Sequence, residues 1–107
     1  MAKFVVIYTG GSGMAASPEE QQRIVDEWGA WYARMGSAII DGGDPFGASR
    51  SIPSVGLVTD GPLGDTPPTG YTIITADSLD EAVASCSDHP HLGQGGQIQV
   101  FEAVEMG

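Results

Sequence analysis

Two histidines, His89 and His91, flank Pro90 and are the only histidines in the chain. Histidine titrates near neutral pH, so these imidazoles are the first candidates for proton transfer. Pro90 makes the segment rigid, and we expect an extended loop that points the two side chains in different directions. A single imidazole acting as general acid or base is the chemistry that this pair favours. The simpler alternative is that one histidine caps the end of the preceding helix, where a cation is stabilised.

Two aspartates, Asp41 and Asp44, bracket a Gly-Gly pair in the middle of the chain. Aspartate is common in turns because its carboxylate bonds to the nearby backbone, and this is the simpler interpretation of both residues. The functional interpretation is that one of them pairs with His89 or His91 and raises the basicity of that imidazole.

A metal site at the two histidines is a weaker alternative, since it needs Asp88 or another carboxylate to converge on them and lacks the helical i, i+4 spacing of histidine ligands. Residues 11–16 follow the pattern G-x-G-x-x-A after a strand, as in dinucleotide-binding proteins. That motif places its glycines in the turn that opens the helix, whereas here the helix opens later, at Ser17-Pro18. We therefore interpret residues 11–16 as a loop that is free to lie over a site, and we expect no cofactor and no metal.

Three aromatic residues, Trp28, Trp31 and Tyr32, lie within five positions of the first expected helix. They span too wide an arc to share one narrow stripe of that helix. We expect Trp28 to pack in the core, and Trp31 or Tyr32 to lie at an interface or a pocket rim. In a substrate pocket, we expect Trp28 with Tyr8 or Tyr71 to supply the aromatic wall.

The chain of 107 residues is strongly acidic, with 14 acidic and 4 basic residues and a formal net charge of −10. This balance opposes binding to nucleic acid and to anionic membranes, although one arginine could still hold a small carboxylate. No segment approaches the roughly 20 apolar residues of a membrane span. The lone Cys86 excludes an internal disulfide and is interpreted as a buried thiol. These features predict a single cytoplasmic domain over residues 1–107.

The first expected strand is apolar on both alternating faces, with Phe4, Val6 and Tyr8 on one and Val5 and Ile7 on the other. A strand that is apolar on both sides must be covered on both sides. In so short a chain, helices can cover one face, and a second copy of the chain is the natural cover for the other. The pattern therefore predicts a homodimer.

The rest of the chain alternates strand and helix signals, with an irregular connection over residues 46–51. The order predicts an α+β fold of the split βαβ type, with an antiparallel sheet and two helices on one face. Capping-box sequences mark both helix starts. The expected elements are a helix from Ser17 to Gly36, a strand at 38–40, a weak strand at 55–59, a strand at 71–75, a helix at 78–87 and a last strand at 97–103.

Several motifs, in this order and spacing, resemble the YCII-related proteins, and within them the branch known for an Asp-Gly-Pro-Phe motif. Leu63 replaces the Phe of that motif here. The similarity covers nearly the whole chain. The motifs are Ser17-Pro18-Glu19-Glu20, Trp28-Gly29-Ala30-Trp31, Asp60-Gly61-Pro62-Leu63, Gly70-Tyr71, Ala76-Asp77-Ser78-Leu79-Asp80-Glu81-Ala82, and Pro90-His91-Leu92 up to Gly95-Gly96.

The resemblance implies a ferredoxin-like fold that forms a dimeric α/β barrel, related to muconolactone isomerases and small cofactor-free monooxygenases. Archetypal members carry a His on the first helix and an Asp before the Pro ahead of the last strand, as a proposed catalytic dyad. This chain has no His on its first helix, and His89 stands before Pro90, so the dyad is not carried over. Branch members are often encoded beside alternative sigma factors, which implies a regulatory link.

The leading hypothesis is a cofactor-free enzyme of the lyase or isomerase type, acting on a small, partly aromatic molecule in a pocket of a homodimer. His89 or His91 would move the proton, with Asp44 or Asp41 as partner. The sequence leaves open whether the protein catalyses a reaction at all. The alternative is a non-catalytic module that binds a ligand or partner protein and is linked to transcriptional regulation.

Overall fold

The computed structural model describes residues 2–11, 17–54 and 56–106. Its main sheet has four strands in the order β2-β5-β1-β6, and every neighbouring pair is antiparallel. The first strand lies inside the sheet, between the two strands that come last in the chain, as a split βαβ fold requires. The predicted α+β class and antiparallel sheet are confirmed, and the topology is compatible with a ferredoxin-like fold. The strands are β1 (Ala2–Gly10), β2 (Ile39–Asp41), β5 (Pro68–Ala76) and β6 (Gly96–Ala103).

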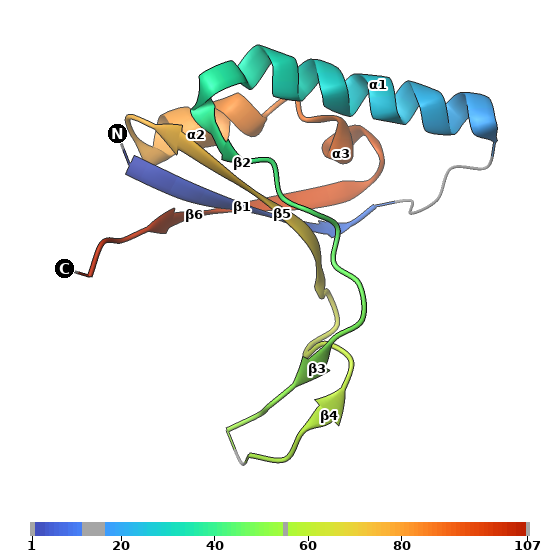
Figure 1. Cartoon of the computed structure of the whole chain (residues 1–107), viewed down its shortest axis with the longest axis vertical. Helices are drawn as coiled ribbons and strands as arrows, with labels where there is room; N and C mark the ends of the chain where they lie inside the picture. Colours follow the sequence, from blue (N-terminus) through green and yellow to red (C-terminus); the bar gives the residue numbers. More distant parts are fainter. Residues whose placement is uncertain (1, 12–16, 55, 107) are drawn as a thin grey trace.

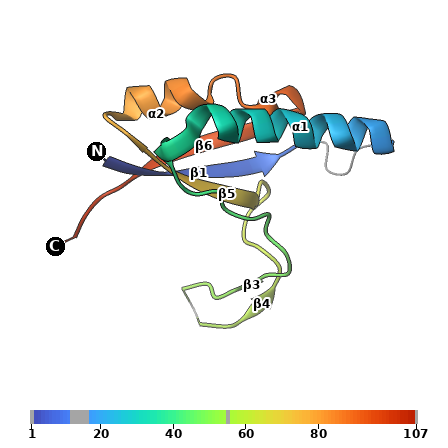
Figure 2. The same cartoon turned by 45° about the horizontal axis from the view of Figure 1, so that its top comes forward.

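Three helices lie over one face of this sheet, and Figures 1 and 2 agree that the other face carries none. Two of them were predicted. The third is a single helical turn in the segment that was expected to be an extended histidine loop. The helices are α1 (Pro18–Met35), which continues into a short 3₁₀ turn at Gly36–Ala38, α2 (Leu79–Cys86) and α3 (Pro90–Gly93).

Both long helices begin as their sequences predict. The Ser17 hydroxyl accepts a hydrogen bond from the Glu20 backbone N–H at 3.2 Å, and Pro18 occupies the first turn. Ser78 accepts in the same way from the N–H of Glu81 at 3.1 Å. These side chains satisfy backbone donors that a helix leaves unpaired at its start. These caps therefore determine the residues at which α1 and α2 begin.

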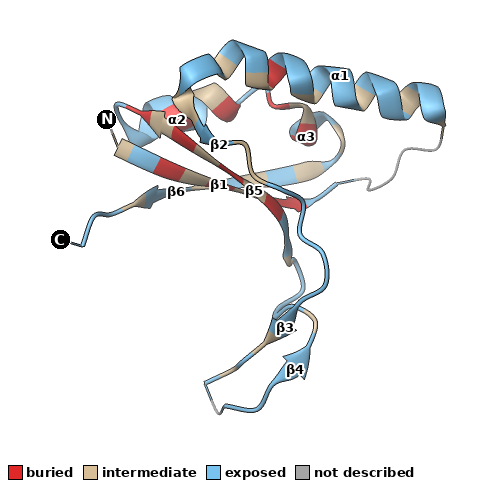
Figure 3. Ribbon diagram, viewed as in Figure 1, coloured by how far each residue is buried: buried red, intermediate tan, exposed pale blue. Residues whose placement is uncertain are grey.

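The core fills the space between the sheet and the helices, which Figure 3 shows as buried segments of β1, β5, α2 and α3. Phe4, Val6 and Tyr8 of β1 face the helices and are buried, whereas Val5 and Ile7 on the open face are half-buried. The alternation expected for this strand is thus confirmed. The core consists of Phe4, Val6, Tyr8, Trp31, Ile74, Ala76, Ala82 and Cys86.

Either Trp31 or Tyr32 was expected at an interface or a pocket rim, and Trp31 is not the residue that lies there. Its side chain is only 3% exposed, and its indole N–H donates to the Ser85 carbonyl of α2 at 3.0 Å. A buried tryptophan needs such an acceptor. The position of α2 against α1 supplies it, and that position is a tertiary feature that the helical spacing of α1 does not reveal.

An arm formed by residues 45–67 projects from the main sheet on the side away from the helices (Figures 1 and 2). It contains a separate two-stranded sheet of β3 (Arg50–Ser51) and β4 (Thr59–Asp60). The predicted strand at 55–59 is confirmed only at Thr59, and β3 forms where an irregular connection was expected. Residue 55 lies outside the described residues. Four apolar side chains of the arm are 61–72% exposed: Ile52, Leu57, Val58 and Leu63.

Among the described residues, no helix is long and apolar enough to cross a membrane.

Candidate functional site

A cleft of about 1120 Å³ lies between α1 and the end of the main sheet at which β1 ends and β5 and β6 begin. All three residues predicted for an aromatic wall, Tyr8, Trp28 and Tyr71, line it. Trp28 also packs against the core, as predicted, so one part of its ring is structural and another faces the cleft. Tyr32 lines the cleft too, in agreement with its expected place at a pocket rim.

His91 lies in the wall of this cleft, on the single turn of α3, and is 6% exposed. Its Nε2 atom lies 2.8 Å from the backbone oxygen of Thr9. A carbonyl oxygen only accepts hydrogen bonds, so Nε2 carries the proton and donates it. In the neutral imidazole, Nδ1 then holds a lone pair, and no described residue forms a hydrogen bond with that atom. His91 is thus held at one nitrogen and available at the other.

The first residue of β6, Gly96, makes room for this imidazole. A Cβ atom at Gly96 would overlap the His91 ring, and one at Gly11 would lie 2.9 Å from ring atom Cε1. Gly96 belongs to the Gly-rich segment 93–96, whose composition is typical of a turn. The structure gives Gly96 a second task, because only glycine allows the ring to lie flat against this backbone.

His89 lies outside the described lining of the cleft and is 2% exposed. Its Nδ1 accepts the backbone N–H of His91 at 3.0 Å, which makes it the N-cap of α3. Its Nε2 therefore carries the proton in the neutral ring and lies 3.2 Å from the Tyr8 hydroxyl. Burial, reinforced by the neighbouring His91, lowers the pKa of His89 to about 4. The ring is neutral at pH 7.

Two expectations about the histidine segment are wrong. No cationic histidine caps the end of α2; a neutral His89 caps the start of α3 instead. The two side chains do not diverge either, because both rings contact Tyr8, with centroid distances of 5.0 Å for His89 and 5.3 Å for His91. His89 accepts the backbone N–H of His91 as the N-cap of α3, and this bond holds its ring over the turn that carries His91.

Tyr8 links His89 to the loop after β2. Its hydroxyl accepts from His89 Nε2 and lies 2.7 Å from the Thr72 hydroxyl, which in turn donates to the Gly42 carbonyl at 3.0 Å. Tyr32 donates to the same carbonyl at 2.9 Å. Burial raises the pKa of Tyr8 well above its ordinary value, so its hydroxyl stays protonated. This series of hydrogen bonds connects the core to the wall of the cleft.

The two candidate aspartates differ. Asp41 accepts the Gly43 N–H at 2.9 Å in a turn, as the simpler interpretation predicts, and its other oxygen accepts from the Tyr71 hydroxyl at 3.3 Å. Asp44 lines the cleft. Neither carboxylate forms a hydrogen bond or ion pair with a histidine among the described residues. The predicted pairing with an imidazole is not formed here, and the catalytic roles of both remain predictions.

The Gly-Gly pair between these aspartates has a steric reason. A Cβ atom on Gly43 would overlap the Tyr71 carbonyl, and the backbone there has a φ of 76°, which favours glycine. The loop therefore lies directly against β5, and this contact brings Asp44 to the cleft.

Gln94 is a site residue that the sequence interpretation treated only as part of a turn. It lines the cleft, and its amide nitrogen is fully buried without a hydrogen-bond partner among the described residues. A buried unpaired donor costs about 1–3 kcal/mol, so a bound oxygen towards which the Gln94 amide turned would relieve this cost. The thiol of Cys86, by contrast, is buried in the core, and burial raises its pKa to about 11.

All four basic side chains lie in the described part of the chain, and none of them lines the cleft. Arg23 pairs with Glu27 at 2.7 Å, Arg34 with Asp88 at 2.6 Å and Arg50 with Asp60 at 3.6 Å. The suggestion that an arginine holds a small carboxylate therefore finds no residue at this site.

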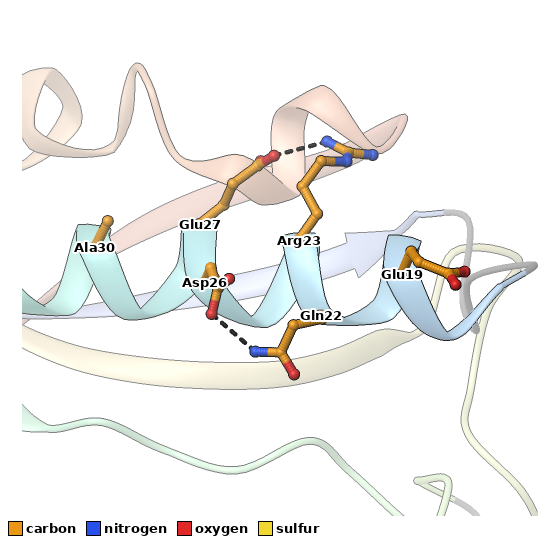
Figure 4. A pocket seen from close by; sticks show the side chains of 6 residues that line it. All are labelled: Glu19, Gln22, Arg23, Asp26, Glu27 and Ala30. Atoms are coloured by element: carbon orange, nitrogen blue, oxygen red, sulfur yellow. Dashed lines mark hydrogen bonds and ion pairs between the residues drawn. The ribbon is translucent and has the colours of Figure 1, made fainter.

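A second hollow, of about 570 Å³, lies along the outer face of α1 (Figure 4). Its side chains are polar and already bonded along the helix, as Gln22 is to Asp26 at 2.9 Å. Such i, i+4 pairs are typical of a solvated helix surface. We therefore do not regard it as a site.

The described residues contain no group of three or more His, Cys, Asp or Glu side chains that could hold a metal ion. The glycine-rich segment 12–16, interpreted as a loop over the site, lies outside the described residues. No family model matches the chain, and no curated protein matches it either. The resemblance to the YCII-related proteins therefore stays a prediction.

Proposed function

We propose that the cleft binds a small, partly aromatic molecule and that His91 transfers a proton to or from it, without a cofactor. The observation that carries this proposal is the bonding of the His91 ring, whose Nε2 is held by the Thr9 carbonyl while Nδ1, in the cleft wall, has no hydrogen-bond partner among the described residues. A positioned imidazole with one available nitrogen is the usual general acid or base of enzymes.

In this reaction Nδ1 of His91 accepts a proton from the substrate and returns it at a second carbon, as in an isomerase, or to a leaving group whose bond to the substrate breaks, as in a lyase. The Thr9 carbonyl keeps the ring in place and stabilises the imidazolium through its bond to Nε2–H. A backbone carbonyl thus takes the orienting role that was expected of Asp41 or Asp44. Trp28 and Tyr71 supply flat apolar surfaces for an aromatic substrate.

The test is exchange of the α-protons of 2-tetralone, a neutral aromatic ketone, in deuterated water. We expect the protein to accelerate this exchange and the His91→Asn variant to lose the acceleration, since Asn keeps a side-chain donor for Thr9 but has no basic nitrogen. Glu102→Gln, at the far end of β6, is the control and should exchange as fast as the parent. Equal rates in the parent and His91→Asn would remove the catalytic role.

A second candidate function is a non-catalytic module that binds a ligand or partner and acts in transcriptional regulation. It is favoured by one observation: no carboxylate among the described residues pairs with either imidazole. The imidazole nitrogen NMR shifts of His91 distinguish the two. A shift of Nδ1 on binding of 2-tetralone supports direct contact with the reacting group, whereas binding that leaves Nδ1 unchanged supports the module.

We also propose that the chain forms a homodimer across the open face of the sheet, as a dimeric α/β barrel of the YCII-related family. On this face the described strands β1, β5 and β6 carry no acidic residue. Two copies with a net charge of −10 repel each other, so they approach at least cost over a surface that carries no acidic residue. The face is apolar at its centre and includes Val5, Ile7, Ile73 and Phe101, the last 53% exposed.

Light scattering during gel filtration tests the dimer. Ile7→Glu places a carboxylate at the centre of the open face and should give a monomer. Val83→Glu, which places the same charge on the exposed side of α2, should leave the dimer intact. A parent protein that is monomeric at every concentration would contradict this assembly.

The buried free thiol of Cys86 supports the cytoplasm as the compartment in which the protein acts.

A further inference from the structure

We propose that the ligand of the cleft is an organic cation: an amine with an aromatic body. This inference rests on the proposed binding function and names its ligand class. Its basis is the combination of an aromatic wall, an acidic rim and the absence of every lysine and arginine of the protein from the cleft.

The charge at the cleft has one sign. Asp44 and Asp65 lie on its rim, on the loop after β2 and the loop before β5. Asp44 forms no ion pair with a described residue, and neither does Asp65. The four basic side chains of the chain, all of them described, lie elsewhere, and three are already paired with carboxylates. A carboxylate or phosphate ligand would meet two like charges here and no lysine or arginine, whereas an ammonium group would meet two carboxylates.

The wall behind this rim suits the rest of such a ligand. Trp28 and Tyr32 lie with their ring centroids 6.3 Å apart on α1, and Tyr71 lies on the sheet side of the cleft. Aromatic faces attract cations as well as apolar rings. The field of a chain with net charge −10 also concentrates cations near its clefts.

Gln94 lines the cleft, and its buried amide nitrogen has no hydrogen-bond partner among the described residues. A hydroxyl or carbonyl oxygen on the bound amine would supply the missing acceptor once this side chain turned towards the cleft.

Three probes of equal size test the ligand class: 2-phenylethylamine, 2-phenylethanol and phenylacetate, which are cationic, neutral and anionic at pH 7. Binding is followed in amide NMR spectra through Trp28 and Gly43. We expect the amine to bind about fivefold more tightly than the alcohol, and the alcohol more tightly than the acid. The reason is that an attraction or repulsion between exposed charges changes the affinity by roughly this factor.

The Asp44→Asn/Asp65→Asn variant should lower the affinity for the amine about fivefold and leave the affinity for the alcohol unchanged. Two neutralisations far from the cleft, Glu102→Gln with Asp80→Asn, serve as the charge-matched control and should leave the order of the probes unchanged. If the alcohol or the acid binds as tightly as the amine, or if the control lowers amine binding as much as the cleft variant, the cationic ligand is wrong while the binding cleft stands. If none of the three shifts Trp28 or Gly43, the binding function itself is overturned, and the ligand class with it.

Discussion

His89 and His91 stand two residues apart on the same helical turn, and they use their ring nitrogens in opposite ways. His89 accepts a backbone N–H at Nδ1 and turns its Nε2–H into the core, towards Tyr8. His91 donates from Nε2 to the backbone carbonyl of Thr9 and leaves Nδ1 unbonded by described residues in the cleft wall. One ring is bonded at both nitrogens, and the other is bonded at one.

The difference comes from the backbone group that each ring meets. The start of a helix offers unpaired N–H groups, so the ring at the N-cap must be an acceptor and therefore stays neutral. The end of β1 offers a carbonyl oxygen, so the ring beside it must be a donor. Two identical side chains in one short motif thus divide into a structural residue and a candidate catalytic residue.

The largest effect should come from His89→Ala. It removes a fully buried ring and the cap of α3, and we expect the free energy of unfolding to fall by about 4 kcal/mol. The His91 ring lies in the wall of an open cleft, so His91→Ala should lower the free energy of unfolding by only about 2 kcal/mol. Urea unfolding of both variants measures the difference. His89→Asn keeps a capping oxygen and should recover about 1 kcal/mol. A greater loss for His91→Ala would reverse the assignment of the two residues.

The pH dependence of stability sharpens the same comparison. The folded pKa of His89 is about 4 and its ordinary value is 6.5, so between these values the unfolded chain binds a proton that the folded chain does not. Stability must therefore fall as the pH falls from about 6.5 to 4, by about 3 kcal/mol from this residue. The acidic residues also titrate in this range, so the measurement is the parent curve minus that of His89→Asn. A flat difference would show that folding does not lower the pKa of His89.

The sequence predicted the parts of this arrangement that depend on local signals. Ser17 and Ser78 fix both helix starts because a capping box acts within four residues. The alternation of β1 placed Tyr8 on one face with Phe4 and Val6, and the aromatic spacing of α1 assigned Trp28 to core packing. Each of these signals is carried by the side chains of one segment.

The rest depends on groups without a side-chain signature. The partner of His91 is a backbone oxygen 82 residues away in the chain, and every residue has such an oxygen. His89 is neutral because its ring is buried beneath α1, and the same packing buries Trp31 of that helix. The unpaired amide of Gln94 becomes visible only when its surroundings are known. Pro90 indicated a rigid loop, although proline is equally suited to the first turn of a helix.

Gly96→Ala tests the role of His91 without changing His89. The added methyl group overlaps the His91 ring, so we expect the ring to leave the Thr9 carbonyl, at a cost of about 2 kcal/mol. Proton exchange of 2-tetralone should be lost while His89 keeps its bond to Tyr8. Gly93→Ala is the control, because its Cβ meets no atom within 4 Å, and both properties should be retained. If Gly96→Ala exchanges at the parent rate, the position of His91 does not matter for the reaction.

The smallest effect should come from Tyr8→Phe, which tests the structural role of the hydrogen bond between His89 and Tyr8. The change keeps the ring but removes the hydroxyl between His89 and Thr72, and leaves a buried N–H unpaired, at a cost of about 1–2 kcal/mol. Because His91 contacts the Tyr8 ring and not its hydroxyl, the imidazole nitrogen shifts of His91 should stay at their parent values. Those shifts and urea unfolding are measured on the same sample. A change at His91 as large as that at His89 would mean that the two rings form one coupled unit, and the division between them would fail.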